Sequence, residues 1–480
     1  MSTKLYYYIS NFILVLILLV CIFQYNANYY NGLDNHALMI TSMTSVIILL
    51  IYMISPSQPF KKKRISFFKI TTFFLLSYFI VHFSNYLHYT FKTVDLRFLE
   101  SHSVNKAAIL SLCCFISLIL GIKSTNNPFY HRTSVKFDCK TNDFLSYIFL
   151  VALCLFYGFT DKRFFTSGGN YEILNNIGWH PLGQVGNSLC IAAVLASIIS
   201  VYFRCNEQGI ANITFKEYLI KFPLKFYFLL FLYLGLILIS GDRGPMIDIG
   251  VAFVSNYFIV SRKKIKFLQL IILVIIASFA LTFLAYLRAN PDNLSIDKVL
   301  AVSNRLKESN ENTNGLYIMT KDLSNVVNSY HLVYFFTESY GIIYGLGAFF
   351  QIIGILPGVR SIIYNMLGLD ISILSTDVIA TNLLGEEHGA GTTCVADTFY
   401  NFGLYGTLLI FFIFGKLIKK LELSLYSYSG SLFVIVVAFS YLTKAIYLGR
   451  SSLFQPMNLI AYTFLCLFLS TIFLNRGKSQ

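Results

Sequence analysis

The sequence predicts an all-α integral membrane protein with about twelve transmembrane helices. Its 480 residues are 56% hydrophobic and only 12% charged, whereas about a quarter of the residues in soluble domains are charged. Apolar stretches long enough to cross about 30 Å of hydrocarbon recur along almost the whole chain. No small-residue cleavage site follows the first stretch, so we expect a retained helix and not a cleaved signal peptide.

The apolar stretches divide the chain into two sets of helices and one long connection. Helices one to nine are expected within residues 1–287, a long loop in 288–401, and the last three helices within 402–480. The predicted spans are residues 9–24, 37–55, 65–84, 107–122, 143–159, 185–203, 223–240, 244–260, 267–287, 402–418, 430–448 and 457–474.

Lysine and arginine cluster between alternate spans, as in Lys61–Arg64 and Lys416–Lys420. The positive-inside rule therefore predicts that both termini are cytoplasmic and that 288–401 lies on the outer face. The net charge of +14 could indicate a protein that binds nucleic acid. Because the basic residues lie between the apolar spans, where the positive-inside rule explains them, we expect membrane lipids as partners and no nucleic acid. Within the loop, glycines interrupt the apolar segment Ser339–Ile355, and we expect an interfacial or re-entrant helix there. The nine cysteines show no metal-ligand spacing, so no metal site is expected.

The hairpin Ser240–Pro245 is the strongest local signal. Its sequence, SGDRGP, forms almost the entire connection between two spans and holds Arg243 at the outer surface. Gly244 permits a sharp bend, and Pro245 suits the first turn of the next helix, whose N–H groups lie beside Arg243. This combination is typical of a phosphate or diphosphate site. The alternative is an arginine that only caps the hairpin in the headgroup layer.

A second signal lies just before the tenth span, where Glu387, His388 and Asp397 are close in sequence. Titratable groups beside apolar surface are candidates for acid–base catalysis. Between them, a glycine-rich turn would let backbone N–H groups approach a substrate closely. The candidate substrate-contacting residues of this segment are Gly389, Gly391, Thr392, Thr393 and Asn401. The alternative is a solvated loop whose acidic residues cap the next helix.

Arginine is also expected on the outer face at four further positions, Arg163, Arg288, Arg360 and Arg450. The positive-inside rule disfavours such an arrangement in short outer loops, so several arginines on this face suit a polyanionic ligand such as a lipid diphosphate. Lys444 falls within the eleventh span and is either a functional charge or a side chain that reaches the headgroups.

The C-terminal half, from Leu230 onward, resembles the Wzy-type O-antigen and capsule polymerases. The resemblance rests on Gly241–Gly244, on the Pro-x-x-Arg turn Pro357–Arg360, on the segment Gly389–Gly403 and on Arg450. These polymerases often carry Glu at the position where this chain has Asp397, which leaves the role of that carboxylate open.

The resemblance implies a metal-independent glycosyltransferase of the GT-C type, without a cofactor, in the inner membrane of a bacterium. It would move a growing glycan from undecaprenyl diphosphate to a hydroxyl of the next lipid-linked repeat unit. Arginines would neutralise the departing diphosphate, and a carboxylate or histidine would deprotonate the acceptor. A chain-length regulator and a flippase are implied as further partners.

Three other activities compete with this interpretation. An O-antigen ligase would share the fold and donor but use a lipid core acceptor. A flippase or transporter of lipid-linked oligosaccharide should carry paired charges near the bilayer midplane and inverted repeats. A membrane acyltransferase would need an intramembrane histidine, for which His82 is the rough candidate.

Overall fold

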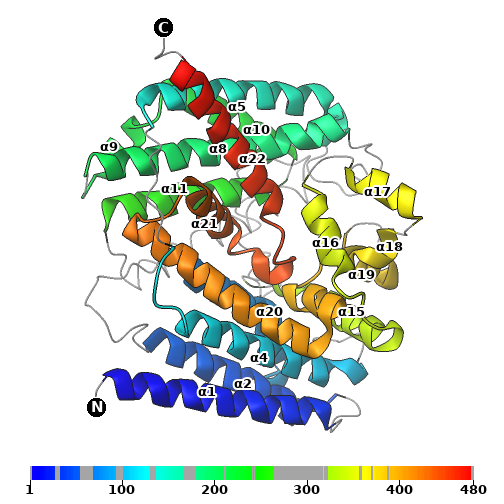
Figure 1. The fold of residues 1–480 in the computed structure, drawn as a ribbon. Coiled ribbons are helices and arrows are strands. Elements are labelled where there is room, and N and C mark those ends of the chain that lie inside the picture. Colours follow the sequence, from blue (N-terminus) through cyan, green and yellow to red (C-terminus); the bar gives the residue numbers. More distant parts are fainter. Residues whose placement is uncertain are drawn as a thin grey trace, which may run out of the picture.

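The computed structural model describes most of the chain, and every regular element in the described ranges is a helix (Figure 1). These ranges are residues 3–27, 33–54, 69–92, 101–129, 137–166, 180–209, 212–240, 242, 244–263, 317, 320, 323–355, 359–368, 371–385 and 389–476.

The helices of the N-terminal part are α1 (Thr3–Asn26), α2 (Asn35–Ile54), α3 (Ile70–Thr90), α4 (Ser101–Lys123), α5 (Cys139–Phe159), α6 (Lys162–Thr166), α8 (Pro181–Glu207), α9 (Phe215–Ile220), α10 (Leu224–Ser240) and α11 (Gly244–Ser261). The later helices are α15 (Val327–Tyr340), α16 (Leu346–Ile353), α17 (Val359–Leu367), α18 (Ile371–Leu374), α19 (Thr376–Leu384), α20 (Cys394–Ser427), α21 (Leu432–Lys444), the 3₁₀ turn η2 (Leu448–Arg450) and α22 (Met457–Arg476).

Eight of the described helices are long and apolar enough to cross a membrane, namely α1 to α5, α8, α11 and α20. Three shorter apolar helices, α10, α21 and α22, accompany them. Each predicted span other than 267–287 overlaps one of these helices, although the bounds differ by up to nine residues, as for span 402–418 and α20. Span 267–287 lies outside the described residues, so the count of twelve stays a prediction.

Side-chain caps explain where several of these helices begin. Asp138 accepts a hydrogen bond from the Thr141 N–H at the start of α5, and Ser431 accepts one from Val434 at the start of α21. Thr393 does the same for the Ala396 N–H at 3.1 Å. This cap starts α20 eight residues before the predicted span 402–418, because a hydroxyl that satisfies an unpaired N–H group stabilises the first turn of a helix.

Glycines bring the backbones of two helix pairs into direct contact. A methyl group on Gly415 of α20 would lie 2.3 Å from the Leu118 carbonyl oxygen of α4, and one on Gly121 would lie 2.1 Å from the Phe412 oxygen. A methyl group on Gly186 of α8 would lie 2.4 Å from the Phe156 N of α5. Small residues at such crossings are typical of membrane helix packing.

A buried ion pair fixes the C-terminal half of α20. Lys419 Nζ lies 2.6 Å from Glu422 Oε1, and both side chains are at most 5% exposed. The other carboxylate oxygen of Glu422 accepts hydrogen bonds from the N–H and the hydroxyl of Thr71 at the start of α3. Because both charges are paired and hydrogen-bonded, the cluster can be accommodated in the core.

Helices α15 to α19 gather at one end of the bundle, on the right in Figure 1. The predicted re-entrant segment is divided here: α15 ends at Tyr340, and α16 follows after Gly341 and Gly345, both of which have positive φ angles. With eight residues, α16 is about 12 Å long and too short to cross the hydrocarbon core.

Candidate active site

Asp397 is the centre of a buried polar cluster near the start of α20. Its side chain is 2% exposed. Oδ1 accepts a hydrogen bond from Gln351 Nε2 of α16 at 3.0 Å and a longer one from the Thr376 hydroxyl of α19 at 3.4 Å. Oδ2 accepts one from the Ser452 hydroxyl at 2.8 Å. Asp397 therefore joins α16, α19 and the segment after η2 to one turn of α20.

Gln351 and Ser452 are also in contact with each other. The Ser452 hydroxyl makes a short contact with Gln351 Oε1 in addition to its bond to Asp397. The three side chains thus form a closed triangle. Ser452 also accepts a hydrogen bond from the Phe454 N–H, so the turn that follows Arg450 is fixed to the carboxylate by its own serine.

Asn401 holds α16 in place from the next turn of α20. Its Oδ1 accepts a hydrogen bond from the Ala348 N–H at 3.0 Å, and its Nδ2 donates one to the Asp397 carbonyl at 2.8 Å. A methyl group on Gly347 would lie 2.9 Å from Asn401 Oδ1, so only glycine lets the two helices approach this closely. Asn401 therefore supports the site from within the protein.

Gly403 ends the sequence Tyr-Asn-Phe-Gly, residues 400–403, which closes the segment that resembles the Wzy-type polymerases. It has φ 65° and ψ −172°, a non-helical conformation that kinks α20. A residue with a side chain would be strained at this φ. The kink separates the part of α20 with Asp397 and Asn401 from the long second part, which packs against α4 through Gly415. The motif thus places the polar cluster at the end of a membrane helix.

Arg450 lies beside the glycine-rich segment 389–393. A methyl group on Gly391 would lie 3.8 Å from Arg450 Nη2 and 3.6 Å from Val326 Cγ2. The Arg450 N–H donates to the Tyr447 carbonyl at 3.0 Å, and Gly449 packs against Ser77 of α3. The structure therefore brings two predicted site segments together, although 59 positions of sequence separate them.

The segment 389–393 is itself held at several points. The Ala390 N–H donates to the Thr381 hydroxyl at 2.9 Å, and the Ala390 carbonyl accepts a hydrogen bond from Ser329 at 3.3 Å. Thr393 caps α20. The Thr392 hydroxyl is buried without a hydrogen-bond partner among the described residues, and buried hydroxyls of this kind are rare.

The hairpin between α10 and α11 is linked to Arg450 through a second buried charge. Lys444, at the end of α21, forms an ion pair with Asp248, which lies in the second turn of α11. The Tyr447 N–H donates to the Lys444 carbonyl, and Tyr447 in turn accepts from Arg450. At the hairpin, the Gly244 N–H donates to Asp242 Oδ1 at 3.0 Å, so this particular N–H group is occupied.

Several predicted site residues lie outside the described part of the chain. These are Arg243, Arg288, Glu387 and His388. Arg360 belongs to α17, but its side chain is not among those that the structure describes. Of the predicted residues, the structure brings together Asp397, Arg450, Gly391, Thr393 and Asn401.

Sequence reasoning missed Gln351, Thr376 and the part played by Ser452. One signal was present, since Gln351 is an amide within the otherwise apolar segment 346–355. An amide in such a segment requires a buried partner. Thr376 gave no comparable signal because threonine is common at the start of a helix.

His82, the histidine that an acyltransferase would need, is part of the protein core. It is 1% exposed, and its ring nitrogens face the Ser111 hydroxyl at 3.3 Å and the Cys394 thiol at 3.9 Å. In the described ranges, no three His, Cys, Asp or Glu side chains are placed to hold a metal ion. Metal independence itself stays a prediction.

Comparison with known proteins identifies the family of this chain. The chain matches the family described as O-antigen polysaccharide polymerase Wzy over residues 7–476, nearly its whole length. No curated protein and no solved structure matches significantly. The match extends the resemblance into the N-terminal spans and supports a polymerase over a ligase, a flippase or an acyltransferase. The chain therefore belongs to the Wzy family of multi-pass membrane proteins, which polymerise lipid-linked O-antigen repeat units.

Proposed function

We propose that the chain transfers a growing glycan from undecaprenyl diphosphate to a hydroxyl of the next lipid-linked repeat unit without a metal ion. The bond between the sugar C1 and the diphosphate oxygen breaks, and a bond from C1 to the acceptor oxygen forms. The acceptor proton passes to a protein base, and undecaprenyl diphosphate leaves. The observation that carries this proposal is the position of Arg450 against Gly391 at the start of α20.

Arg450 is the proposed main contact to the departing diphosphate. A guanidinium can donate several hydrogen bonds to phosphate oxygens, and it is most effective where charge develops in the transition state. A diphosphate offers more acceptor oxygens than one guanidinium can satisfy. Arg243, Arg288 and Arg360 are proposed to supply the further positive charge, and Gly244 the close backbone approach at the α10–α11 hairpin.

Glu387 or His388 is proposed as the base that deprotonates the acceptor. They directly precede the segment 389–393, whose glycine Gly391 faces Arg450. Asp397 was the third candidate, but its oxygens already accept hydrogen bonds from Gln351, Ser452 and Thr376. We assign it the role of a positioning residue, which holds the Arg450 turn against α20.

The segment 389–393 is proposed to contact the sugar next to the diphosphate. Among the described residues, no atom lies within 4 Å of the position of a methyl group added to Gly389, so a substrate could approach its backbone. The buried Thr392 hydroxyl is a further group that a sugar hydroxyl could satisfy.

The proposed setting is a twelve-span GT-C-like protein of the bacterial cytoplasmic membrane with both termini inside. The gathering of α15 to α19 at one end of the bundle supports a separate outer segment, 288–401, between helices one to nine and the last three (Figure 1). A flippase that delivers repeat units and a chain-length regulator are the proposed partners.

The test is complementation of a strain that lacks its own polymerase, with the glycan ladder on a gel as the readout. The wild-type chain should restore long glycans if host and chain use the same repeat unit. In a membrane preparation, the same chain should lengthen purified lipid-linked units when excess chelator is present. Loss of elongation with chelator would contradict metal independence, and a failure to elongate matched units under any condition would contradict the polymerase function.

A further inference from the structure

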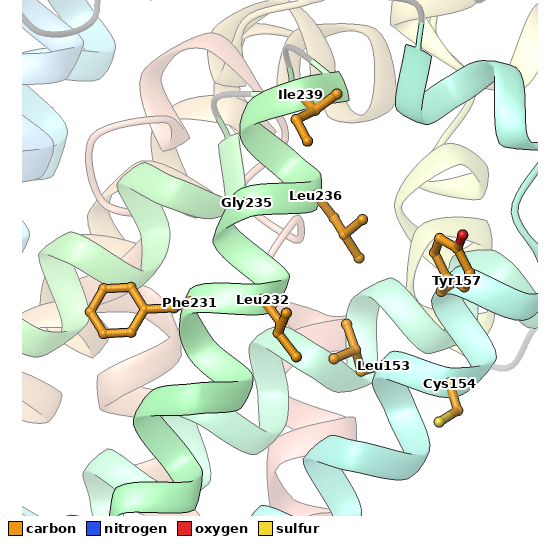
Figure 2. Close-up of a pocket in the computed structure, with 8 residues that line it drawn as sticks. All are labelled: Leu153, Cys154, Tyr157, Phe231, Leu232, Gly235, Leu236 and Ile239. Atoms are coloured by element: carbon orange, nitrogen blue, oxygen red, sulfur yellow. The ribbon is translucent and has the colours of Figure 1, made fainter.

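An apolar groove lies between α5 and α10, where Tyr157, Leu232 and Ile239 are exposed (Figure 2). Leu153 and Tyr157 line it from α5, and Leu232, Leu236 and Ile239 line it from α10. Figure 2 shows Leu232 and Leu236 pointing toward Leu153. The groove has a volume of about 470 Å³, within the range of small-molecule sites.

Gly235 makes the groove possible. A methyl group on it would meet no atom of the described residues within 4 Å, unlike Gly121, Gly186 and Gly415, whose space is filled by a neighbouring backbone. Glycine inside a helix costs about 1 kcal/mol relative to alanine. Because Gly235 does not serve helix packing in the described structure, the open space beside it is available to a ligand.

The groove leads toward the polar end of α10. Ile239 is the residue before Ser240, with which α10 ends, and the hairpin with Asp242 and Gly244 follows at once. From Phe231 to Ile239 the α10 side of the groove rises about 12 Å. A lipid chain lying in it would therefore extend along α10 from Phe231 to the end of the helix at Ser240.

A positive charge stands at the α5 side of the groove. Lys162 Nζ lies 3.5 Å from the centre of the Tyr157 ring and contacts the Tyr157 carbonyl. Arg163 is matched by Asp161, with Nη2 2.6 Å from Oδ2, and these hydrogen bonds lower the pKa of Asp161. Lys162 has no carboxylate partner in the described ranges, so it is the uncompensated cation next to the groove.

We propose that the α5–α10 groove binds the isoprene units of the polyprenyl diphosphate carrier that are nearest to its diphosphate, with Lys162 close to the phosphates. An apolar trough with a cation at its polar end is complementary to a lipid that has an anionic head. The methyl branches of a polyprenyl chain make it bulkier than a straight acyl chain, and the gap at Gly235 provides the extra room. This inference rests on the proposed function, and it adds the place at which the polyprenyl carrier binds the protein.

Photocrosslinking tests the groove directly. The purified full chain in lipid nanodiscs is irradiated with a polyprenyl diphosphate that carries a diazirine on its first isoprene units, and labelled peptides are mapped by mass spectrometry. We expect labels on α5 and α10, removed by excess unlabelled polyprenyl diphosphate and not by excess phosphatidylglycerol. Equal competition by phosphatidylglycerol, or labels confined to other helices, would overturn the proposal.

A matched pair of glycine variants tests whether the open space beside Gly235 is needed for binding. Gly235→Phe should fill the groove and weaken labelling roughly tenfold, the factor that corresponds to about 1.4 kcal/mol of lost binding. Gly250→Phe on α11 is the control, since Gly250 also has no atom within 4 Å of an added methyl group and does not line the groove. Equal labelling of the two variants at equal thermal stability would overturn the proposal.

Lys162→Gln tests the charge. It should weaken labelling by the diphosphate probe and leave labelling by an uncharged polyprenol probe unchanged; equal loss with both probes would contradict a phosphate contact. The glycan ladder separates the two hypotheses. If the wild-type chain restores the ladder but the labels lie on other helices, only the groove proposal is contradicted. If the chain elongates no matched unit, the proposed polymerase function is contradicted.

Discussion

Lys444 and Asp248 form a buried ion pair that joins α21 to α11. The Asp248 side chain is 1% exposed and that of Lys444 is 19% exposed. Asp248 follows the α10–α11 hairpin, and Lys444 precedes the Arg450 turn. The charge within the eleventh span is thus satisfied inside the protein, and it connects α11, which follows the hairpin, to the end of α21, which precedes the Arg450 turn.

Removal of one partner of this pair should lower the stability of the protein far more than removal of both partners. Lys444→Met leaves the Asp248 carboxylate buried without its cation, which typically costs about 3–5 kcal/mol. We expect strongly reduced thermal stability in detergent for this variant, and substantial recovery in the Asp248→Leu, Lys444→Met double variant. Size-exclusion chromatography after heating measures both. If the double variant is as unstable as the single one, the pair is not the source of the loss.

Arg450→Lys should suppress polymer formation nearly as strongly as Arg450→Ala. A lysine ammonium cannot reproduce the planar fork of a guanidinium, and loss of one transition-state contact costs about 3 kcal/mol, or about a hundredfold in rate. The measurement is the glycan ladder at equal membrane abundance. Arg262→Lys is the control, because this arginine stacks on Tyr428 away from the site. Normal ladders for both Arg450 variants would exclude a role in catalysis.

Arg243→Lys is expected to give the same result as Arg450→Lys, with the protein inserted and single repeat units still reaching the cell surface. The reason is again bidentate binding of phosphate oxygens beside a helix N-terminus. Glycan ladders in a polymerase-deleted strain distinguish single units from polymer. An unchanged ladder for Arg243→Ala would mean that this arginine only caps the hairpin and does not bind the diphosphate.

Asp397 and Gln351 should be energetically coupled. Each alanine variant leaves a partner buried without its hydrogen bond, at a cost of about 1–3 kcal/mol. The decrease in the free energy of unfolding should therefore be smaller for the double variant than the sum of the two single decreases, by about 0.5–3 kcal/mol. Unfolding measurements in a double-mutant cycle determine this difference. Asp397→Asn should lower stability and polymer length together. Complete loss of polymer at unchanged stability would instead identify Asp397 as the base.

Gly415→Ala should destabilise the helix bundle. Its new methyl group would lie 2.3 Å from the Leu118 carbonyl oxygen, so α4 and α20 would have to move apart, at a cost of about 1–3 kcal/mol. Gly250→Ala on α11 is the matched control, since its methyl group meets no described atom within 4 Å, and it should leave the stability unchanged or raise it by up to about 1 kcal/mol, because alanine favours a helix over glycine. Equal melting temperatures for the two variants would show that the contact is not close in the membrane.

Hydropathy predicted most of the helices because a membrane span is a local property of the sequence. The predicted span 244–260 agrees with α11, Gly244–Ser261, since Gly244 and Pro245 mark its start. The start of α20 was missed because its first turns contain Asp397 and Asn401, which hydropathy counts against a span. Their partners lie elsewhere in the chain: Gln351 is 46 positions from Asp397. Such pairs depend on tertiary packing, which no local pattern reveals.

The glycine contact between α4 and α20 has a consequence for how specificity can evolve in this protein. Gly415 lies about five helical turns from Asp397, on the same helix, so the position of the proposed catalytic end relative to the bundle depends on a contact far from it. Substitutions around the outer segment could then alter which glycan is accepted without shifting this reference point. The helix contact that positions the site and the segment that would contact the glycan are thus different parts of the chain.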